Sequence, residues 1–217
     1  MTLFIILGII MTLVVSKFLS MTFLKGMPSS FILELPPYRK PSPGSIIIRS
    51  LMDRTVFVLG RAAAVAAPAG LVIWLLANIP AGDLSLLDRF TGFCHPFGQL
   101  IGVDGVIIVS FILGFPANEI VIPIMLMCYM STGALTDYAS LSELHHVLTA
   151  AGWDMQTAFS VLILCLFHFP CATSCLTVKK ETGSWKWTAV SILLPASTGF
   201  LICLTVNMLL HLFHLPV

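Results

Sequence analysis

Long runs of apolar residues recur along this chain of 217 residues, and they leave little of the charged surface that a water-soluble domain needs. Hydrophobic residues make up 58% of the chain and charged residues only 10%, whereas a soluble domain carries about 25% charged residues. We therefore expect an integral membrane protein, not a soluble enzyme. The net charge of +1 offers no basic face for a phosphate backbone, so binding to nucleic acid is not expected.

The longest apolar runs predict about four membrane-spanning helices, because about 20 residues rising 1.5 Å each cross the hydrocarbon core of a bilayer. The runs that we expect to span are Leu3–Leu19, Ala62–Ile79, Thr157–Val178 and Trp187–Leu210. The first run also fits a signal peptide, but its positive charge follows it and no small-residue cleavage site is present. We expect a retained helix there, and an all-α, membrane-embedded fold.

A further apolar run, Gly105–Met130, is broken at its centre by the sequence GFPANE at residues 114–119. Glycine, proline and a carboxylate at membrane depth are tolerated where the backbone is buried in protein or lines a cavity. The run is therefore expected to be a re-entrant helical hairpin that turns at Gly114–Pro116, or else a span.

The distribution of Lys and Arg decides between the hairpin and the span. Six of these residues lie between 20 and 61 and three follow residue 178, whereas Arg89 is the only one between 80 and 154. Positive residues favour the cytoplasmic side, so both ends of the broken run are expected outside, which favours the hairpin. The basic segment, proline-rich at its start, is expected to be cytoplasmic and to end in a helix along the membrane surface.

The run Thr157–Val178 is also broken, at Pro170 and Cys171. Proline removes one backbone N–H and frees the carbonyl four residues earlier. If the helix resumes, His168, Cys171 and Cys175 share one face, and imidazole and thiolate suit first-row transition metals. A packed histidine and space-filling cysteines are the alternatives.

Glu119 is the strongest candidate on physical grounds alone. An ionisable group deep in a membrane run is expected to be functional, and this carboxylate can coordinate a cation or relay a proton. Alternatively, Glu119 and Asn118 cap the second half-helix of the broken run at its N-terminus. The two roles are compatible, because the start of a half-helix can hold a binding loop in place.

Three stretches, in their order and spacing, resemble a known family. They are ELPPYR at 34–39 with Pro41, GFPANE at 114–119, and PCAT at 170–173 followed by KETGSWKW at 180–187. Together they resemble the C-terminal membrane half of ferrous-iron transport protein B, with its second gate region, over about 28–209. The resemblance implies the membrane-permease part of a ferrous-iron (Fe2+) uptake transporter, multi-pass in a bacterial inner membrane.

The resemblance also implies an ion pathway and a partner. Fe2+ would be the transported ion, with no permanently bound cofactor. The family's gate motif carries a cysteine at the position of Cys171, and the physical arguments above add Glu119, His168, Cys175 and Asn118 to the expected pathway. No G-x-x-x-x-G-K-[ST] loop occurs, so no enzymatic activity is expected from this chain. A GTP-binding domain that gates transport, and the first gate region, are expected on a partner chain. Whether the chain is a split subunit or a truncated relative, and whether it forms a homo-oligomer, stays open.

The expected organisation follows from these motifs. It comprises a first transmembrane helix (1–19), a cytoplasmic Pro-rich segment with a surface helix (20–61), a gate-type membrane domain with broken elements at 114–119 and 170–175 (62–210), and a tail (211–217). Membrane lipid is the surrounding partner. The alternative functions are a gate-type permease for a small solute such as a nucleoside, or a non-transporting membrane subunit that assembles or regulates a partner.

Overall fold

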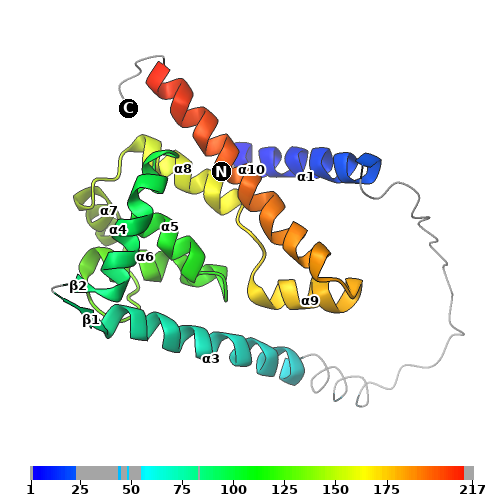
Figure 1. Cartoon of the computed structure of the whole chain (residues 1–217), viewed down its shortest axis with the longest axis horizontal. Helices are drawn as coiled ribbons and strands as arrows, with labels where there is room; N and C mark the ends of the chain where they lie inside the picture. The colour runs from blue at the N-terminus through cyan, green and yellow to red at the C-terminus, as the bar shows by residue number, and fades with distance from the viewer. Residues whose placement is uncertain (1, 23–43, 45–47, 49–54, 83, 213–217) are drawn as a thin grey trace, which may run out of the picture. The chain divides into compact units, whose positions relative to one another are not determined.

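The computed structural model describes residues 2–22, 44, 48, 55–82 and 84–212 (Figure 1). The chain divides into two compact units, Met1–Arg54 and Thr55–Val217. Most of the predicted segment at 20–61, including its surface helix, and most of the predicted tail lie outside the described residues. The predicted domain boundaries therefore stay predictions.

The described part of the first unit is mainly one helix, α1 (Thr2–Thr22). It is apolar along almost its whole length, and none of the stretch Ile5–Thr22 is buried within the chain. A helix of this length and composition can cross a membrane, where lipid or another protein covers its apolar side chains.

The second unit consists of helices and one short hairpin of strands. In chain order its elements are α3 (Phe57–Asn78), β1 (Pro80–Ala81), β2 (Leu84–Ser85), α4 (Leu86–Gln99), α5 (Gly105–Leu113), the 3-10 helix η2 (Asn118–Ile120), α6 (Val121–Met130), α7 (Leu141–Ala150), α8 (Met155–Leu166), α9 (Ala172–Thr182) and α10 (Trp185–Leu212). The described residues thus form nine α-helices, and their two strands have only two residues each. The predicted all-α fold class is confirmed.

Among the described residues, three helices are long and apolar enough to cross a membrane: α1, α3 over Val58–Asn78 and α10 over Trp185–Leu210. α7 and α8 form a bent pair with an angle of 114°, which gives a fourth span if the pair is counted as one. The predicted number of about four spans is confirmed for the described part of the chain. The run Thr157–Val178 is divided between α8 and α9, and residues 167–171 between them are not helical.

The run Gly105–Met130 turns back on itself at its break. α5 and α6 pack along each other, and the Tyr129 hydroxyl near the end of α6 donates a 2.7 Å hydrogen bond to the Asp104 carboxylate just before α5. The other oxygen of Asp104 caps α5 by accepting from the Ile107 amide at 2.8 Å. Because the two ends of the run meet, the run is a helical hairpin, as predicted.

The turn of this hairpin requires glycine. A Cβ atom at Gly114 would lie 2.3 Å from Cγ2 of Val121, which begins α6, and 3.0 Å from the Ser110 carbonyl oxygen. Such distances are far below van der Waals contact, so a larger residue would force the two half-helices apart. Gly114 therefore permits the close return of the chain.

The hairpin also supplies much of the buried core. Ile107, Val109 and Ile124 are completely buried, and residues of α4, α8 and α10 pack around the hairpin. In contrast, α3 and α10 expose large apolar side chains such as Trp74 and Leu193. Protein thus packs around much of the hairpin, and a membrane tolerates a broken helix where its backbone is buried in protein.

Side-chain hydrogen bonds tie the helices together where the hairpin begins and ends. Asn78, at the end of α3, donates to the Gly133 carbonyl at 2.7 Å, just after α6. Asn207 of α10 donates to the carbonyls of Gln99 and Leu100 and accepts a hydrogen bond from Gln156 of α8. The end of α3, both ends of the hairpin and the start of α8 therefore lie at one end of the second unit.

Candidate ion pathway

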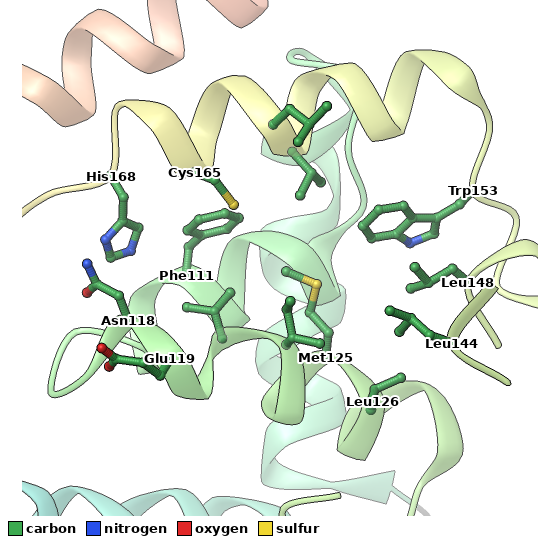
Figure 2. Close-up of a pocket in the computed structure, with 14 residues that line it drawn as sticks. Phe111, Asn118, Glu119, Met125, Leu126, Leu144, Leu148, Trp153, Cys165 and His168 are labelled. Carbon is green, nitrogen blue, oxygen red and sulfur yellow. The ribbon is translucent and has the colours of Figure 1, made fainter. Parts of the chain in front are cut away.

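A cavity of about 410 Å³ lies between the hairpin, α7 and α8 (Figure 2). Most of its wall is apolar, with Met125 of α6, Leu144 and Leu148 of α7, and Val161 of α8 among the lining residues. Polar side chains of three of the predicted site residues, Asn118, Glu119 and His168, also line it. The tertiary structure thus brings the first break and the end of α8 to one cavity.

Asn118 and Glu119 lie in η2, at the turn of the hairpin. Both side chains are exposed, and neither forms a hydrogen bond or ion pair to the part of the chain that the structure describes. The N-caps of η2 and α6 are Ala117 and Ile120, and neither cap has a side-chain hydrogen bond. The capping role considered for Glu119 and Asn118 is therefore not seen, and the carboxylate is available to a ligand.

His168 follows the end of α8, and in Figure 2 its ring faces the Asn118 side chain. The imidazole lies between two aromatic rings, with its centroid 5.2 Å from that of Phe111 and 4.1 Å from that of Phe169. Both ring nitrogens are buried, and neither has a hydrogen-bond partner among the described residues. Buried polar atoms usually have partners, so an unsatisfied imidazole beside a cavity is suited to binding a ligand.

Cys171 and Cys175 lie apart from this cavity wall, at the start of α9. Cys171 is the N-cap residue, and its Sγ lies 3.2 Å from the Thr173 hydroxyl and 3.3 Å from the Ser174 hydroxyl. Cys175 is buried, and its thiol donates to the Pro170 carbonyl at 3.3 Å. Both thiols therefore have oxygen atoms as polar neighbours.

The expectation that His168, Cys171 and Cys175 share one helical face is wrong. The chain leaves the helix after Leu166 and re-enters it at Ala172, so His168 and Cys171 precede α9 and only Cys175 lies within it. Pro170 causes this, because it lacks an N–H and disfavours helical geometry in the residue before it.

The predicted residues thus form two groups instead of one closed metal site. Among the described residues, no three His, Cys, Asp or Glu side chains are close enough to hold a metal ion together. A single backbone hydrogen bond joins the two groups, from the Ala172 amide to the Phe115 carbonyl at 2.8 Å. The hairpin turn and the start of α9 are therefore in direct contact.

The sequence interpretation did not include Cys165, which lines the cavity one helical turn before His168. His168 lies just past the end of α8, but the spacing of three residues would place both side chains on one face if the helix continued to His168. Figure 2 shows the Cys165 sulfur pointing toward Phe111 at the cavity. Trp153, at the far end of the cavity from His168, was also missed, because no local pattern marks it.

Comparisons with known proteins show what this sequence is similar to. The family model described as "Ferrous iron transport protein B C terminus" matches residues 1–53. The "Fe(2+) transporter FeoB" of Staphylococcus aureus is 30% identical over 218 residues, which cover 96% of this chain and 31% of that protein. The chain is homologous to the C-terminal region of FeoB. This confirms the resemblance that the GFPANE and PCAT stretches predicted.

More distant relatives agree with this homology. The "Fe(2+) transporter FeoB" of Campylobacter jejuni is 26% identical, over 91% of this chain and 34% of that protein. A "Fe(2+) transport protein A/Fe(2+) transporter FeoB fusion protein" of Porphyromonas gingivalis is 22% identical, over 90% of this chain and 29% of that protein. The chain thus spans about a third of the length of these FeoB relatives. No solved structure matches it.

The homology and the apolar helices together confirm the predicted location. The chain is a multi-pass protein of the cell membrane, with at least three helices long enough to span among its described residues. Its sequence corresponds to a membrane region of FeoB.

Proposed function

We propose that this chain is the membrane-permease part of an Fe2+ uptake transporter of the bacterial inner membrane. The observation that carries the proposal is Glu119, a carboxylate without a partner among the described residues, on the wall of a cavity that the hairpin turn and the end of α8 share. The names of its FeoB relatives supply the ion.

The donor groups along the cavity suit such an ion. Glu119 and Asn118 offer oxygen atoms, His168 offers an unsatisfied imidazole, and the start of α9 adds the thiols of Cys171 and Cys175. Nitrogen, oxygen and sulfur donors together are typical of sites for first-row transition metals. A divalent cation would shed part of its water at the first group and pass to the second, since Phe115 and Ala172 hold the two groups in contact.

The separation of the two groups supports transport over storage. A closed site with many ligands binds a metal tightly, whereas a pathway must bind the ion weakly enough to release it. Each group here offers only two or three side-chain donors, and no three acidic, His or Cys side chains in the described residues form a joint site. The ion would therefore pass from one partial site to the next.

Opening of the pathway would be driven from outside this chain. We infer that a GTP-binding domain and a first gate region belong to the remaining parts of the transporter, because the chain corresponds to about a third of its FeoB relatives. The exposed apolar faces of α3 and α10 leave room for such a partner, for a second copy of this chain, or for lipid.

The test is substitution of Glu119 by Gln. Gln keeps the shape and one acceptor oxygen but loses the charge that attracts the cation. Removing a charge a few ångströms from an ion costs more free energy than a tenfold change in a binding constant represents. We expect Fe2+ uptake into cells that carry the complete transporter to fall by about tenfold or more. Uptake is measured with radiolabelled iron under reducing, oxygen-free conditions.

Glu181→Gln is the matched control, because Glu181 is also exposed but lies near the end of α9, away from the cavity. This variant should transport normally at equal membrane abundance. Normal uptake by Glu119→Gln would remove the cation role from Glu119.

A second function is supported by the apolar wall of the cavity. A volume of about 410 Å³ with a few polar groups at one end also suits a small organic solute such as a nucleoside. Labelling of Cys171 with a thiol reagent separates the two readings. Fe2+ should lower the labelling if the ion passes this residue, whereas a solute permease or a non-transporting subunit should be labelled equally with and without Fe2+.

A further inference from the structure

A chain of three hydrogen-bonded side chains closes the end of the hairpin. The Trp153 indole Nε1 donates to the Tyr129 hydroxyl at 3.0 Å, and this hydroxyl donates to the Asp104 carboxylate at 2.7 Å. Asp104 is itself fixed as the N-cap of α5. Trp153 is thus held to both half-helices of the hairpin, although it belongs to the turn between α7 and α8.

The same indole ring forms one end of the cavity. Figure 2 shows Trp153 beside Leu144 and Leu148 of α7, at the opposite end of the cavity from Glu119 and His168. This end has no ionisable side chain among its lining residues. An apolar constriction can block ions by losing its water, so these apolar residues oppose the entry of a cation from this end of the cavity.

The connection between α7 and α8 is a short turn at Gly152. α7 packs mainly on α6, and the two helices of the bent pair meet at 114°. Gly152, just before Trp153, has a φ of +86°, and no atom lies within 4 Å of the position that its Cβ would occupy. Glycine adopts this left-handed conformation without strain, and the turn has open space beside it.

We propose that α7 and Trp153 form the outer gate of the cavity, and that Tyr129 and Asp104 are the latch that holds this gate closed. The proposal rests on the function proposed above and names how the entrance is controlled. Tyr129 acts as a positioning residue, since it contacts the gate and not the ion. Breaking its hydrogen bond to Trp153 shifts the gate toward its open state without changing the polar end of the cavity.

The test measures how fast a reagent added outside reaches Cys165, which is exposed on this chain and lines the cavity beyond Trp153. A charged, membrane-impermeant methanethiosulfonate is added outside cells that carry the full chain with its natural partners, and labelling of Cys165 is followed by mass spectrometry. Tyr129→Phe removes the hydroxyl and keeps the ring. We expect the labelling rate to rise about two- to tenfold, because losing one hydrogen bond changes the equilibrium between the closed and open gate by about this factor.

Three further variants keep the result interpretable. Tyr138→Phe is the matched control, because the Tyr138 hydroxyl has no hydrogen bond among the described residues, and its labelling rate should equal that of the wild type. Trp153→Phe removes the indole N–H and should raise the rate as Tyr129→Phe does. Cys165→Ala should abolish the measured signal.

An unchanged or lower rate in both Tyr129→Phe and Trp153→Phe would overturn the gate. Iron takes no part in this measurement, so its outcome is independent of the Glu119→Gln test. Faster labelling of Cys165 together with normal iron uptake by Glu119→Gln would keep the gate and reject the iron pathway. The reverse pair of results would keep the pathway and reject the gate.

Discussion

The break at residues 114–120 folds the chain back on itself, whereas the break at 167–171 joins α8 to α9 through a non-helical link. At the first break the two half-helices pack together, and Gly114 allows their close approach. At the second break Pro170 ends the helix, and the chain passes directly to the N-cap of α9. Both breaks expose polar groups that a continuous helix would not offer.

The two breaks differ most in whether those groups are satisfied. Glu119 at the first break has no partner among the described residues, but the thiols of Cys171 and Cys175 at the second break each lie beside oxygen atoms. A cation can therefore bind Glu119 without displacing a protein group, whereas binding to Cys171 replaces its contacts with Thr173 and Ser174. The first break is suited to capturing the ion and the second to passing it on.

The largest expected effect concerns membrane topology, that is, the side of the membrane on which the two ends of the run Gly105–Met130 lie. If the hairpin is re-entrant, positions 89 and 145 face the same, outer side, and Lys179 faces the cytoplasm. Single cysteines at these three positions, in a background without native cysteines, should be labelled by an impermeant reagent from outside at 89 and 145 only. Labelling of 89 and 145 from opposite sides would contradict a re-entrant hairpin with both of its ends outside.

A smaller effect is expected from Cys171→Ser at the second break. Oxygen replaces sulfur at nearly the same size, so packing changes little, but a soft donor is lost from the pathway. Fe2+ uptake should fall several-fold at equal membrane abundance. Cys203→Ser is the control, because Cys203 is fully buried in the core and bonds only to the Ser160 carbonyl. Equal uptake by the two variants would show that the thiol of Cys171 is not a ligand.

The smallest effect is expected where the two breaks touch. Ala172→Pro removes the amide that donates to Phe115, and proline is accepted at the first position of a helix after an extended residue such as Cys171. Losing this bond should cost about 0.5–1.5 kcal/mol and lower the Tm of the purified protein by a few degrees.

Met155→Pro provides the comparison for this variant. Met155 is the first residue of α8, follows an extended Asp154 and has an exposed side chain, so proline should be tolerated there. A Tm drop of the same size in both variants would mean that the contact between the breaks adds nothing to stability.

Much of the fold could be predicted because a bilayer permits few solutions. The runs at 62–79 and 187–210 correspond to α3 and α10, and glycine and proline at 114 and 116 mark the hairpin turn. The expected continuous face of His168, Cys171 and Cys175 failed, because helical periodicity was extended across Pro170. Asp104, Tyr129 and Trp153 gave no signal, since residues far apart in sequence form their hydrogen bonds.

The sequence by itself determined the environment, the helical class and the positions of the two breaks. These follow from composition and local residue types, because hydrocarbon excludes unpaired backbone groups and proline interrupts a helix wherever it stands. Only the tertiary structure decided that Glu119 and His168 share a cavity while Cys171 and Cys175 stand apart from it. It also decided that Trp153 closes the other end, because such contacts depend on how helices pack across long separations in the chain.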